Sequence, residues 1–280
     1  MTMLRRVRAN GRGRDFVVGD VHGHFAQLTQ QLAGCGFDPA VDRLFFLGDV
    51  VDRGPDSEAV LAMIDQRTYC SVLGNHEAMM IAGFEEPGQS LLHRMNGGEW
   101  FYELPVERQK MWVERVRSWP WAIEVDTGQG IAGLVHANVP DCRWERVVGG
   151  LNDIDPAWQA GEPLSAPAIG PVAHQLLWSR TLAEYLYRAI PETSWPGKYT
   201  GENNALPEAS APDGVPVWDA ALPAQALGLF KASGIDAIYL GHTYVPAVTR
   251  AGDCYFLDTY RAEPGEQLGL LCLNVQIRGE

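Results

Sequence analysis

The sequence lacks the features by which several classes of protein are identified. No apolar run approaches the ~20 residues that a membrane-spanning helix requires, so we expect no membrane partner. Residues 1–14 contain five arginines but not the apolar segment of a secretory signal, and we expect them to form a flexible basic tail. Internal repeats and low-complexity tracts are also missing.

The sequence also lacks an excess of positive charge. The 22 basic and 35 acidic side chains give a net charge of -13, which argues against nucleic acid as a partner because its phosphates favour clustered Lys and Arg. A protein this acidic should also repel anionic substrates such as phosphate esters. Bound cations could reverse that field locally, so the charge alone does not exclude such a substrate.

Paired cysteines are a third absence. The five cysteines are odd in number, widely spaced, and include no CxxC pair. This pattern is more typical of buried reduced thiols in a cytoplasmic protein than of a disulfide or zinc framework. We therefore expect free thiols at Cys35, Cys70, Cys142, Cys254 and Cys272.

Apolar side chains, in contrast, are abundant. A chain of 280 residues that is 46% hydrophobic can bury a substantial core, and we expect one domain over residues 15–280. Its first part alternates strand and helix, which predicts a βαβαβ unit with three parallel strands. The predicted strands are residues 16–18, 44–47 and 69–73, and the helices begin at Phe25 and at Asp56 or Ser57.

The rest of the chain returns to strands after a helical, aromatic-rich segment at about 90–119, whose large side chains we expect to pack on the sheet. This order predicts an α/β fold with a mixed sheet or two packed sheets, flanked by helices. Residues 152–171 and 191–223 are rich in Pro, Gly, Asn and Ala, and we expect loop insertions that face the substrate. The later strands are predicted at 121–125, 131–135, 237–240, 247–249, 255–257 and 270–275.

Polar side chains follow the predicted strands at the point where each strand ends. Open α/β sheets place their sites at such strand ends. Carboxylate, imidazole and amide oxygen together suit divalent cations such as manganese, iron or zinc. Any one of these histidines alone would more often be structural, but so many polar strand ends together predict a shared dinuclear metal centre. The residues are Asp20, His22, Asp49, Asn75, His136 and His242.

Several short motifs carry a family resemblance that spans about residues 15–260. The segments GDVHG at 19–23, GDVVDRG at 48–54 and GNHE at 74–77, with the later His136 and Gly241-His242, resemble the calcineurin-like metallophosphoesterases. The DRG and NHE forms resemble in particular the phosphoprotein phosphatase branch, which includes bacterial and phage serine/threonine phosphatases. The resemblance implies two packed sheets flanked by helices, with the site at the strand ends.

The resemblance also implies which residues bind each metal ion. Asp49 would bridge two divalent ions about 3.5 to 4 Å apart, because one carboxylate can bind both and offset their repulsion. A water molecule between the metals would attack phosphorus in line. Manganese is the expected metal, with iron or zinc as alternatives. The first ion would be bound by Asp20, His22 and Asp49, and the second by Asp49, Asn75, His136 and His242.

Four further residues match positions that act on the substrate. His76 resembles the general acid that protonates the leaving oxygen, and Asp52 resembles the carboxylate that orients it, although Asp52 could instead pair with Arg53 in the loop. Arg53 resembles a phosphate-binding arginine. Arg180 resembles the second phosphate arginine of the bacterial branch, with an ordinary surface arginine as the alternative. By contrast, no catalytic position matches His24, His93 or His174, which we expect to be structural or exposed.

The function implied is a metal-dependent phosphomonoesterase that acts on phosphoserine or phosphothreonine in proteins or on small phosphoesters. One alternative is a diphosphohydrolase of the symmetrical bis(5'-nucleosyl)-tetraphosphatase type, but in those relatives the positions of Asp52 and Glu77 commonly carry other residues. A catalytically silent, metal-stabilised binding protein is a third possibility. Against it stand His76 and Arg53, which a purely structural metal site would not need.

Overall fold

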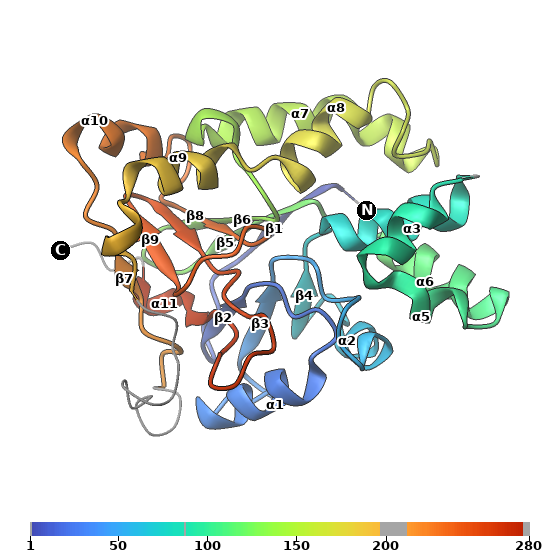
Figure 1. Ribbon diagram of the computed structural model, residues 1–280, viewed down its shortest axis with the longest axis horizontal. Coiled ribbons are helices and arrows are strands. Elements are labelled where there is room, and N and C mark those ends of the chain that lie inside the picture. The colour runs from blue at the N-terminus through green and yellow to red at the C-terminus, as the bar shows by residue number, and fades with distance from the viewer. Residues whose placement is uncertain (1, 87, 197–211, 277–280) are drawn as a thin grey trace.

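The computed structural model describes residues 2–86, 88–196 and 212–276. Two β-sheets pack together and helices cover their outer faces, so the predicted α/β architecture is confirmed (Figure 1). One sheet has four strands in the order β11-β2-β3-β4, and the other has seven in the order β1-β5-β6-β8-β10-β9-β7. No helix within the described ranges is both long enough and apolar enough to span a bilayer.

The four-stranded sheet contains the predicted βαβαβ unit. Strands β2, β3 and β4 are parallel, with Val18 opposite Phe46 and Phe46 opposite Ser71, and β11 joins β2 in the antiparallel direction. Parallel strands need a crossover between them, which α1 and α2 supply. The bounds are β2 Asp15–Val18, α1 Phe25–Gly34, β3 Arg43–Phe46, α2 Ser57–Met63, β4 Tyr69–Ser71 and β11 Leu270–Cys272.

The seven-stranded sheet is mixed. Strands β5 and β6 form an antiparallel pair, and β6 also pairs in parallel with β8, the central strand of the seven. At one edge β1 runs parallel to β5, and at the other β7 runs parallel to β9. The bounds are β1 Leu4–Val7, β5 Ala122–Asp126, β6 Ile131–Val135, β7 Trp218–Asp219, β8 Ala237–Leu240, β9 Thr249–Ala251 and β10 Cys254–Phe256.

Alternating side chains divide the core into layers. Val17 and Phe45 belong to a buried cluster that also includes Ile123 and Tyr239 of the other sheet, so this cluster fills the space between the sheets. The neighbouring side chain of Phe46 belongs to the larger cluster beneath the helices. Because both faces of the four-stranded sheet are covered, its strands are mainly apolar on both sides, which explains their hydrophobic runs.

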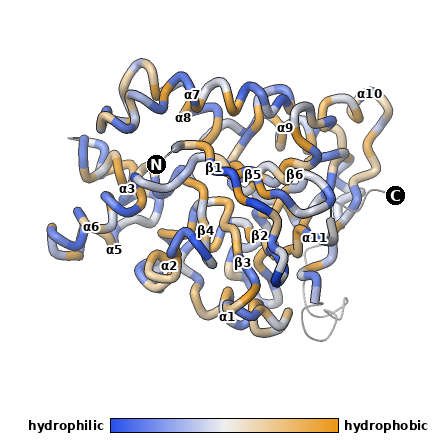
Figure 2. Tube along the Cα trace, turned by 180° about the vertical axis from the view of Figure 1, so that it is seen from behind, coloured by the Kyte–Doolittle hydropathy of each residue, from blue (hydrophilic) through white to orange (hydrophobic). Residues whose placement is uncertain are grey.

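The helices that cover the sheets also bury an apolar face against the core. Helix α7, Trp144–Gln159, buries Trp144, Val147, Leu151, Ile154 and Trp158, which recur at the three- and four-residue spacing of one helix face. Figure 2 shows apolar and polar residues alternating along this helix. The remaining helices are α3 Asn75–Glu85, α4 Ser90–His93, η1 Arg94–Gly98, α5 Glu99–Tyr102, α6 Val106–Arg117, η2 Pro140–Cys142, α8 Gly170–Ala173, η3 His174–Trp178, α9 Thr181–Ala189, η4 Glu192–Ser194, α10 Ala224–Leu227, η5 Gly228–Phe230 and α11 Leu273–Gln276.

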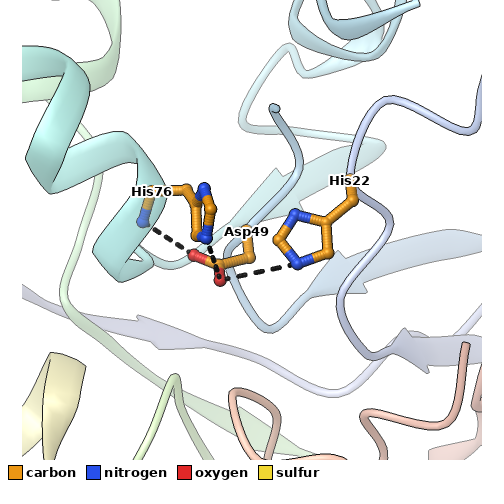
Figure 3. Close-up of side chains that lie close together, drawn as sticks. All are labelled: His22, Asp49 and His76. Carbon is orange, nitrogen blue, oxygen red and sulfur yellow. Dashed lines mark hydrogen bonds and ion pairs between the residues drawn. The ribbon is translucent and has the colours of Figure 1, made fainter. Parts of the chain in front are cut away.

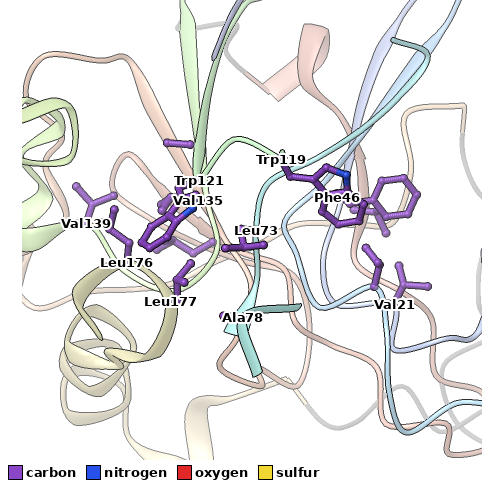
Figure 4. Close-up of a cluster of buried hydrophobic side chains, with 14 of the residues drawn as sticks. Val21, Phe46, Leu73, Ala78, Trp119, Trp121, Val135, Val139, Leu176 and Leu177 are labelled. Atoms are coloured by element: carbon purple, nitrogen blue, oxygen red, sulfur yellow. The ribbon is translucent and has the colours of Figure 1, made fainter. Parts of the chain in front are cut away.

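Part of the core holds the loops that carry polar residues. The cluster in Figure 4 includes Leu73 and Ala78, which flank the Gly-Asn-His-Glu segment, together with Leu176 and Leu177 of η3. Trp121 lies in the same cluster and is fully buried. The segment at 74–77 is therefore anchored on both sides by packed apolar side chains.

The structure differs from the sequence prediction in several places, which include strand β7 within the loop expected at 191–223. The flexible tail expected at 1–14 contains β1, and residues 152–159 of the predicted loop continue α7 because Ile154 and Trp158 extend its apolar face. Strand β11 ends at Cys272, and α11 takes up the remainder of the predicted strand at 270–275. Helix α3 was not predicted. Within 191–223, residues 197–211 lie outside the described residues, and the expectation for them stays a prediction.

All five cysteines are buried thiols that form no disulfide, as the sequence predicts.

Candidate metal centre

The predicted metal-binding residues meet at one edge of the two sheets. Asp20 and His22 follow β2, Asp49 follows β3, and Asn75 begins α3 directly after β4. His136 follows β6 and His242 follows β8, so the second sheet contributes from its own strand ends. All six residues are buried, with at most 8% of any of them exposed.

Asp49 is the residue shared by two groups of possible metal ligands. One group is His22, Asp49 and His76, and the other is Asp49, His136 and His242, with the ligand atoms of each group within 4.8 Å of one another. Figure 3 shows His22 and His76 on either side of the Asp49 carboxylate. Nε2 of His22 lies 3.9 Å from Oδ2 of Asp49, and Nε2 of His136 lies 3.4 Å from Oδ1. A carboxylate in this position can bridge two cations.

The three histidines are oriented in the way that metal-binding histidines usually are. Each has its outer ring nitrogen on a backbone carbonyl, which fixes the tautomer and leaves the inner nitrogen as an acceptor. The outer contacts are His22 Nδ1 to the Val51 carbonyl at 3.0 Å, His136 Nδ1 to Leu47 at 2.7 Å and His242 Nε2 to Trp178 at 3.1 Å.

These histidines are neutral at physiological pH. Burial and then the neighbouring His76 hold the pKa of His22 well below its usual value, and burial and then His242 do the same for the pKa of His136. Burial and the charge of Arg180 lower the pKa of His242 to about 3. Neutral imidazole is the form that binds a metal ion.

The inner nitrogens face other acceptors. Oδ1 of Asn75 lies 2.8 Å from Nε2 of His136 and 2.8 Å from Nδ1 of His242. With both outer nitrogens donating to carbonyls, two imidazole lone pairs and an amide oxygen point at one another. A cation among them would turn this repulsion into coordination, so the donor set fits a divalent metal ion.

The two carboxylates of the centre, Asp20 and Asp49, also favour a bound cation. The pKa of Asp20 is well above its usual value because of burial and the charge of Asp258, and that of Asp49 because of burial and the charge of Asp20. Burying two carboxylates this close together is unfavourable unless a positive charge compensates. The family and this Asp/His cluster together fit a dinuclear divalent metal centre.

Glu77 holds the loop that carries Asp49. Asp49 has a left-handed backbone with φ of 50°, which is uncommon for a residue other than glycine. The Glu77 carboxylate accepts the N–H of Asp49 at 2.8 Å, of Val50 at 2.9 Å and of Gly74 at 2.9 Å. A Cβ at Gly74 would lie 2.3 Å from the Asp49 nitrogen, so only glycine allows this approach. The GNHE motif includes Glu77, but the sequence alone does not indicate this role in holding the loop.

Asp52 and His76 form a hydrogen-bonded pair beside the centre. Nδ1 of His76 lies 2.7 Å from Oδ2 of Asp52, and Nε2 lies 3.8 Å from Oδ2 of Asp49. Burial alone would raise the pKa of Asp52, but hydrogen bonds from His76 and His93 lower it to about 2. Burial lowers the pKa of His76, and Asp52 opposes that shift. The loop ion pair considered for Asp52 and Arg53 is therefore replaced by contacts with two histidines.

The two predicted phosphate arginines are both exposed. The Arg53 guanidinium lies over the centre, with Nη1 2.7 Å from Nε2 of His22 and Nη2 3.0 Å from Nε2 of His76. Arg180 precedes α9, two residues after Trp178, and its charge reaches His242. The geometry thus brings Arg53 to the centre and leaves Arg180 at its periphery.

Two residues near Asp52 have roles that the sequence did not indicate. His93, expected to be structural or exposed, is fully buried and hydrogen-bonded to Asp52. Trp100, expected only in the core, donates from Nε1 to Asp52 at 2.8 Å. They lie on either side of Gly97 and Gly98, and nothing in the sequence indicates that this interruption brings both side chains to Asp52. Of the other histidines, His174 is exposed and His24 is half-buried with its ring 5.0 Å from that of Tyr260.

Comparison with known proteins identifies the family. The calcineurin-like phosphoesterase profile matches residues 16–246, which includes every residue of the centre. The chain belongs to this family. The chain is therefore a metallophosphoesterase.

The relatives of this phosphoesterase have two kinds of name. It is 34% identical over 182 residues to serine/threonine-protein phosphatase 1 of Salmonella typhimurium, covering 64% of this chain and 74% of that protein. It is 41% identical over 68 residues to a symmetrical bis(5'-nucleosyl)-tetraphosphatase of Dechloromonas aromatica, covering 24% and 25% of the two chains. The crystal structure of a cold-active protein-tyrosine phosphatase of Shewanella aligns over 98% of this chain and 78% of that one, with a TM-score of 0.56 and 16% identity, which shows the shared fold.

Proposed function

We propose that this protein is a metal-dependent serine/threonine protein phosphatase, which hydrolyses phosphomonoesters. The observation that carries the proposal is the His76–Asp52 pair, with Nδ1 of His76 2.7 Å from Asp52 and Nε2 directed toward Asp49. A histidine so held can deliver a proton to a leaving oxygen next to the metal centre. An alkoxide leaving group needs that proton, whereas a diphosphate leaves without it more easily.

The metal ions in this proposal are two divalent cations, with manganese expected and iron or zinc as alternatives. When bound, they supply Lewis acidity that activates water and neutralises charge on the phosphate. They would also answer the question raised by the net charge of -13, because the local field becomes positive. One ion would be held by Asp20, His22 and Asp49, and the other by Asp49, Asn75, His136 and His242.

Arg53 and the His76–Asp52 pair supply the rest of the chemistry. The Arg53 guanidinium already lies between His22 and His76, where its planar fork could instead hold two phosphate oxygens. His76 gives a proton from Nε2 to the leaving oxygen, and Asp52 stabilises the charged ring before transfer. Arg180, which lies between η3 and α9, would provide a second positive charge to the phosphate.

The tetraphosphatase activity is the second candidate because several relatives have that name. The matches to them cover between 24% and 52% of the chain, whereas the match to the Salmonella phosphatase covers 64%. The longer match and the acidic Asp52 both favour the phosphatase. A diphosphate leaving group makes less use of a carboxylate-supported general acid.

The test compares substrates on the purified protein. With manganese, the wild-type protein should release phosphate from a phosphoserine peptide at least ten times faster than it cleaves diadenosine tetraphosphate. His76→Asn should lower turnover of the peptide at least a hundredfold while manganese content stays the same. A tenfold preference for the dinucleotide would reverse the assignment, and no hydrolysis of either substrate by metal-loaded protein would support a binding protein instead.

A further inference from the structure

The Asp52 carboxylate is surrounded by N–H groups from three separate segments of the chain. Its Oδ2 lies 2.7 Å from Nδ1 of His76 and 3.0 Å from Nε2 of His93. Its Oδ1 lies 2.8 Å from Nε1 of Trp100 and 3.1 Å from Nε2 of His93. His93 thus spans both oxygens, and rotation of the carboxylate would break at least one of these contacts.

His93 is itself held in one orientation. Nδ1 of His93 lies 3.1 Å from the Tyr102 hydroxyl, which can donate to it, and a ring that accepts at Nδ1 donates from Nε2. A Cβ at Gly98 would lie 2.2 Å from the His93 ring, so the backbone of η1 packs directly on the imidazole. The ring is fully buried and also packs edge-on against Tyr102, with centroids 5.5 Å apart.

The same segment lies against the loop that carries Asp52. Gly97 has φ of 99°, and a Cβ there would lie 2.7 Å from the Arg53 nitrogen. The Arg53 N–H approaches the Gly97 carbonyl at 3.5 Å. The interruption of the helix at 97 and 98 therefore brings His93 and Trp100 onto Asp52, one from each side of the two glycines.

We propose that His93 is a positioning residue that locks the Asp52 carboxylate so that His76 presents Nε2 to the leaving oxygen. This inference rests on the proposed function, in which His76 is the proton donor. His93 does not touch the reacting atoms; it acts through Asp52. A rotated Asp52 would release Nδ1 of His76, and a misplaced proton donor slows only reactions that need the proton.

The first test uses leaving groups of different quality. His93→Phe keeps a planar ring but removes the donor to Asp52, and we expect kcat on a phosphoserine peptide to fall about tenfold with KM changed less than twofold. On p-nitrophenyl phosphate, whose leaving group departs without a proton, the loss should be below twofold. His93→Gln retains an N–H donor and should recover most of the lost turnover.

A matched substitution controls for the loss of an imidazole. His24 is half-buried against Tyr260 and outside the Asp52 cluster, so His24→Phe should leave both substrates unaffected. A double-variant cycle adds a second control. The variant that combines His76→Asn with His93→Phe should be no slower than His76→Asn alone, because His93 acts only through His76.

Equal losses of His93→Phe on the two substrates, or losses that multiply in the double variant, would overturn the inference. A crystal structure of His93→Phe tests it without any substrate. We expect the Asp52 carboxylate to turn away from Nδ1 of His76, and an unchanged Asp52–His76 pair would overturn the positioning role. Failure of the wild-type protein to hydrolyse the peptide would instead count against the proposed function, since the structural comparison does not depend on activity.

Discussion

Asp49 and Asp52 lie on the same loop after β3, and both are buried, yet their surroundings shift their pKa values in opposite directions. Asp49 lies near Asp20 and Glu77, and its pKa is raised well above the usual value by burial and then by the charge of Asp20. Asp52 accepts hydrogen bonds from two histidines and a tryptophan, and its pKa falls to about 2 despite burial.

The difference shows that the two carboxylates have different kinds of partner. The N–H groups of the protein itself satisfy Asp52, so it stays ionised and fixed in the folded chain. Asp49 is set among carboxylates and imidazole lone pairs, and its negative charge is balanced only when cations bind. This contrast supports the proposal that Asp52 serves proton transfer through His76 and that Asp49 serves the metal centre.

The largest expected effect is the loss of metal-dependent activity on Asp49→Asn. Because Asp49 is shared by both groups of ligands, we expect turnover to fall at least a thousandfold in the presence of manganese. Manganese should raise the melting temperature of the wild-type protein by several degrees and that of the variant by much less. Calorimetry with and without manganese measures the melting temperatures of the two proteins. An equal manganese-induced rise in melting temperature for wild type and variant would refute a bridging role.

Asp52→Asn should have a smaller and different effect. We expect a loss of about a hundredfold on the phosphoserine peptide, because His76 loses the charge that supports its protonated form. Manganese content should match that of the wild-type protein. Metal analysis together with steady-state kinetics distinguishes the roles of the two carboxylates. Loss of manganese from Asp52→Asn would contradict the separate roles of Asp49 and Asp52.

Acid unfolding gives a third comparison. Since the folded pKa of Asp52 lies below its unfolded value, Asp52 contributes stability above about pH 4, and this contribution is lost as the pH falls toward 2. The fall in the pKa of Asp52 from its usual 3.8 to about 2 corresponds to about 2 kcal/mol of folding stability. Urea unfolding of metal-free wild type and Asp52→Asn should differ most at neutral pH and converge near pH 2. A difference that is constant with pH would contradict this assignment.

The smallest effect expected is a gain in stability. In the presence of a chelator, Asp49→Asn replaces a buried carboxyl group whose pKa is raised. The backbone N–H of His76 lies 2.9 Å from Oδ1 of Asp49, and the amide oxygen of the asparagine can still accept this hydrogen bond. We expect the metal-free variant to be more stable than metal-free wild type by about 1 kcal/mol. The same thermal scans in chelator measure this gain, and Asp52→Asn under those conditions should be destabilised instead.

The sequence was sufficient to predict the part of the fold that holds the metal centre. Continuous apolar runs at β2, β3 and β4, each ending in a polar residue, predict a parallel sheet with Asp20, Asp49 and Asn75 at one edge, and the structure has them there. The signal was strong because strands that are covered on both faces leave little alternative to a buried parallel sheet.

The surroundings of Asp52 could not be predicted in the same way. His93 and Trp100 reach Asp52 only because the helix is interrupted at Gly97, where φ is 99°, and no pattern of hydrophobic residues specifies the direction of the chain after such a break. Helix α3 was missed because its first seven residues, Asn75 to Ile81, are all buried, so this part lacks the one-sided periodicity that identifies a surface helix. Strand β1 was missed because Arg5 and Arg6 make up half of it, so the segment lacks the apolar run by which most of the other strands were predicted.

The pairing of β11 with β2 bears on when the centre can form during synthesis. Leu271 lies opposite Val17 across the four-stranded sheet, and the Gly19 N–H donates to the Gly269 carbonyl at 3.0 Å. The loop with Asp20 is thus braced by residues that leave the ribosome roughly 250 positions later. Contacts between such distant segments form slowly, so metal binding should follow the arrival of this last strand instead of nucleating the fold.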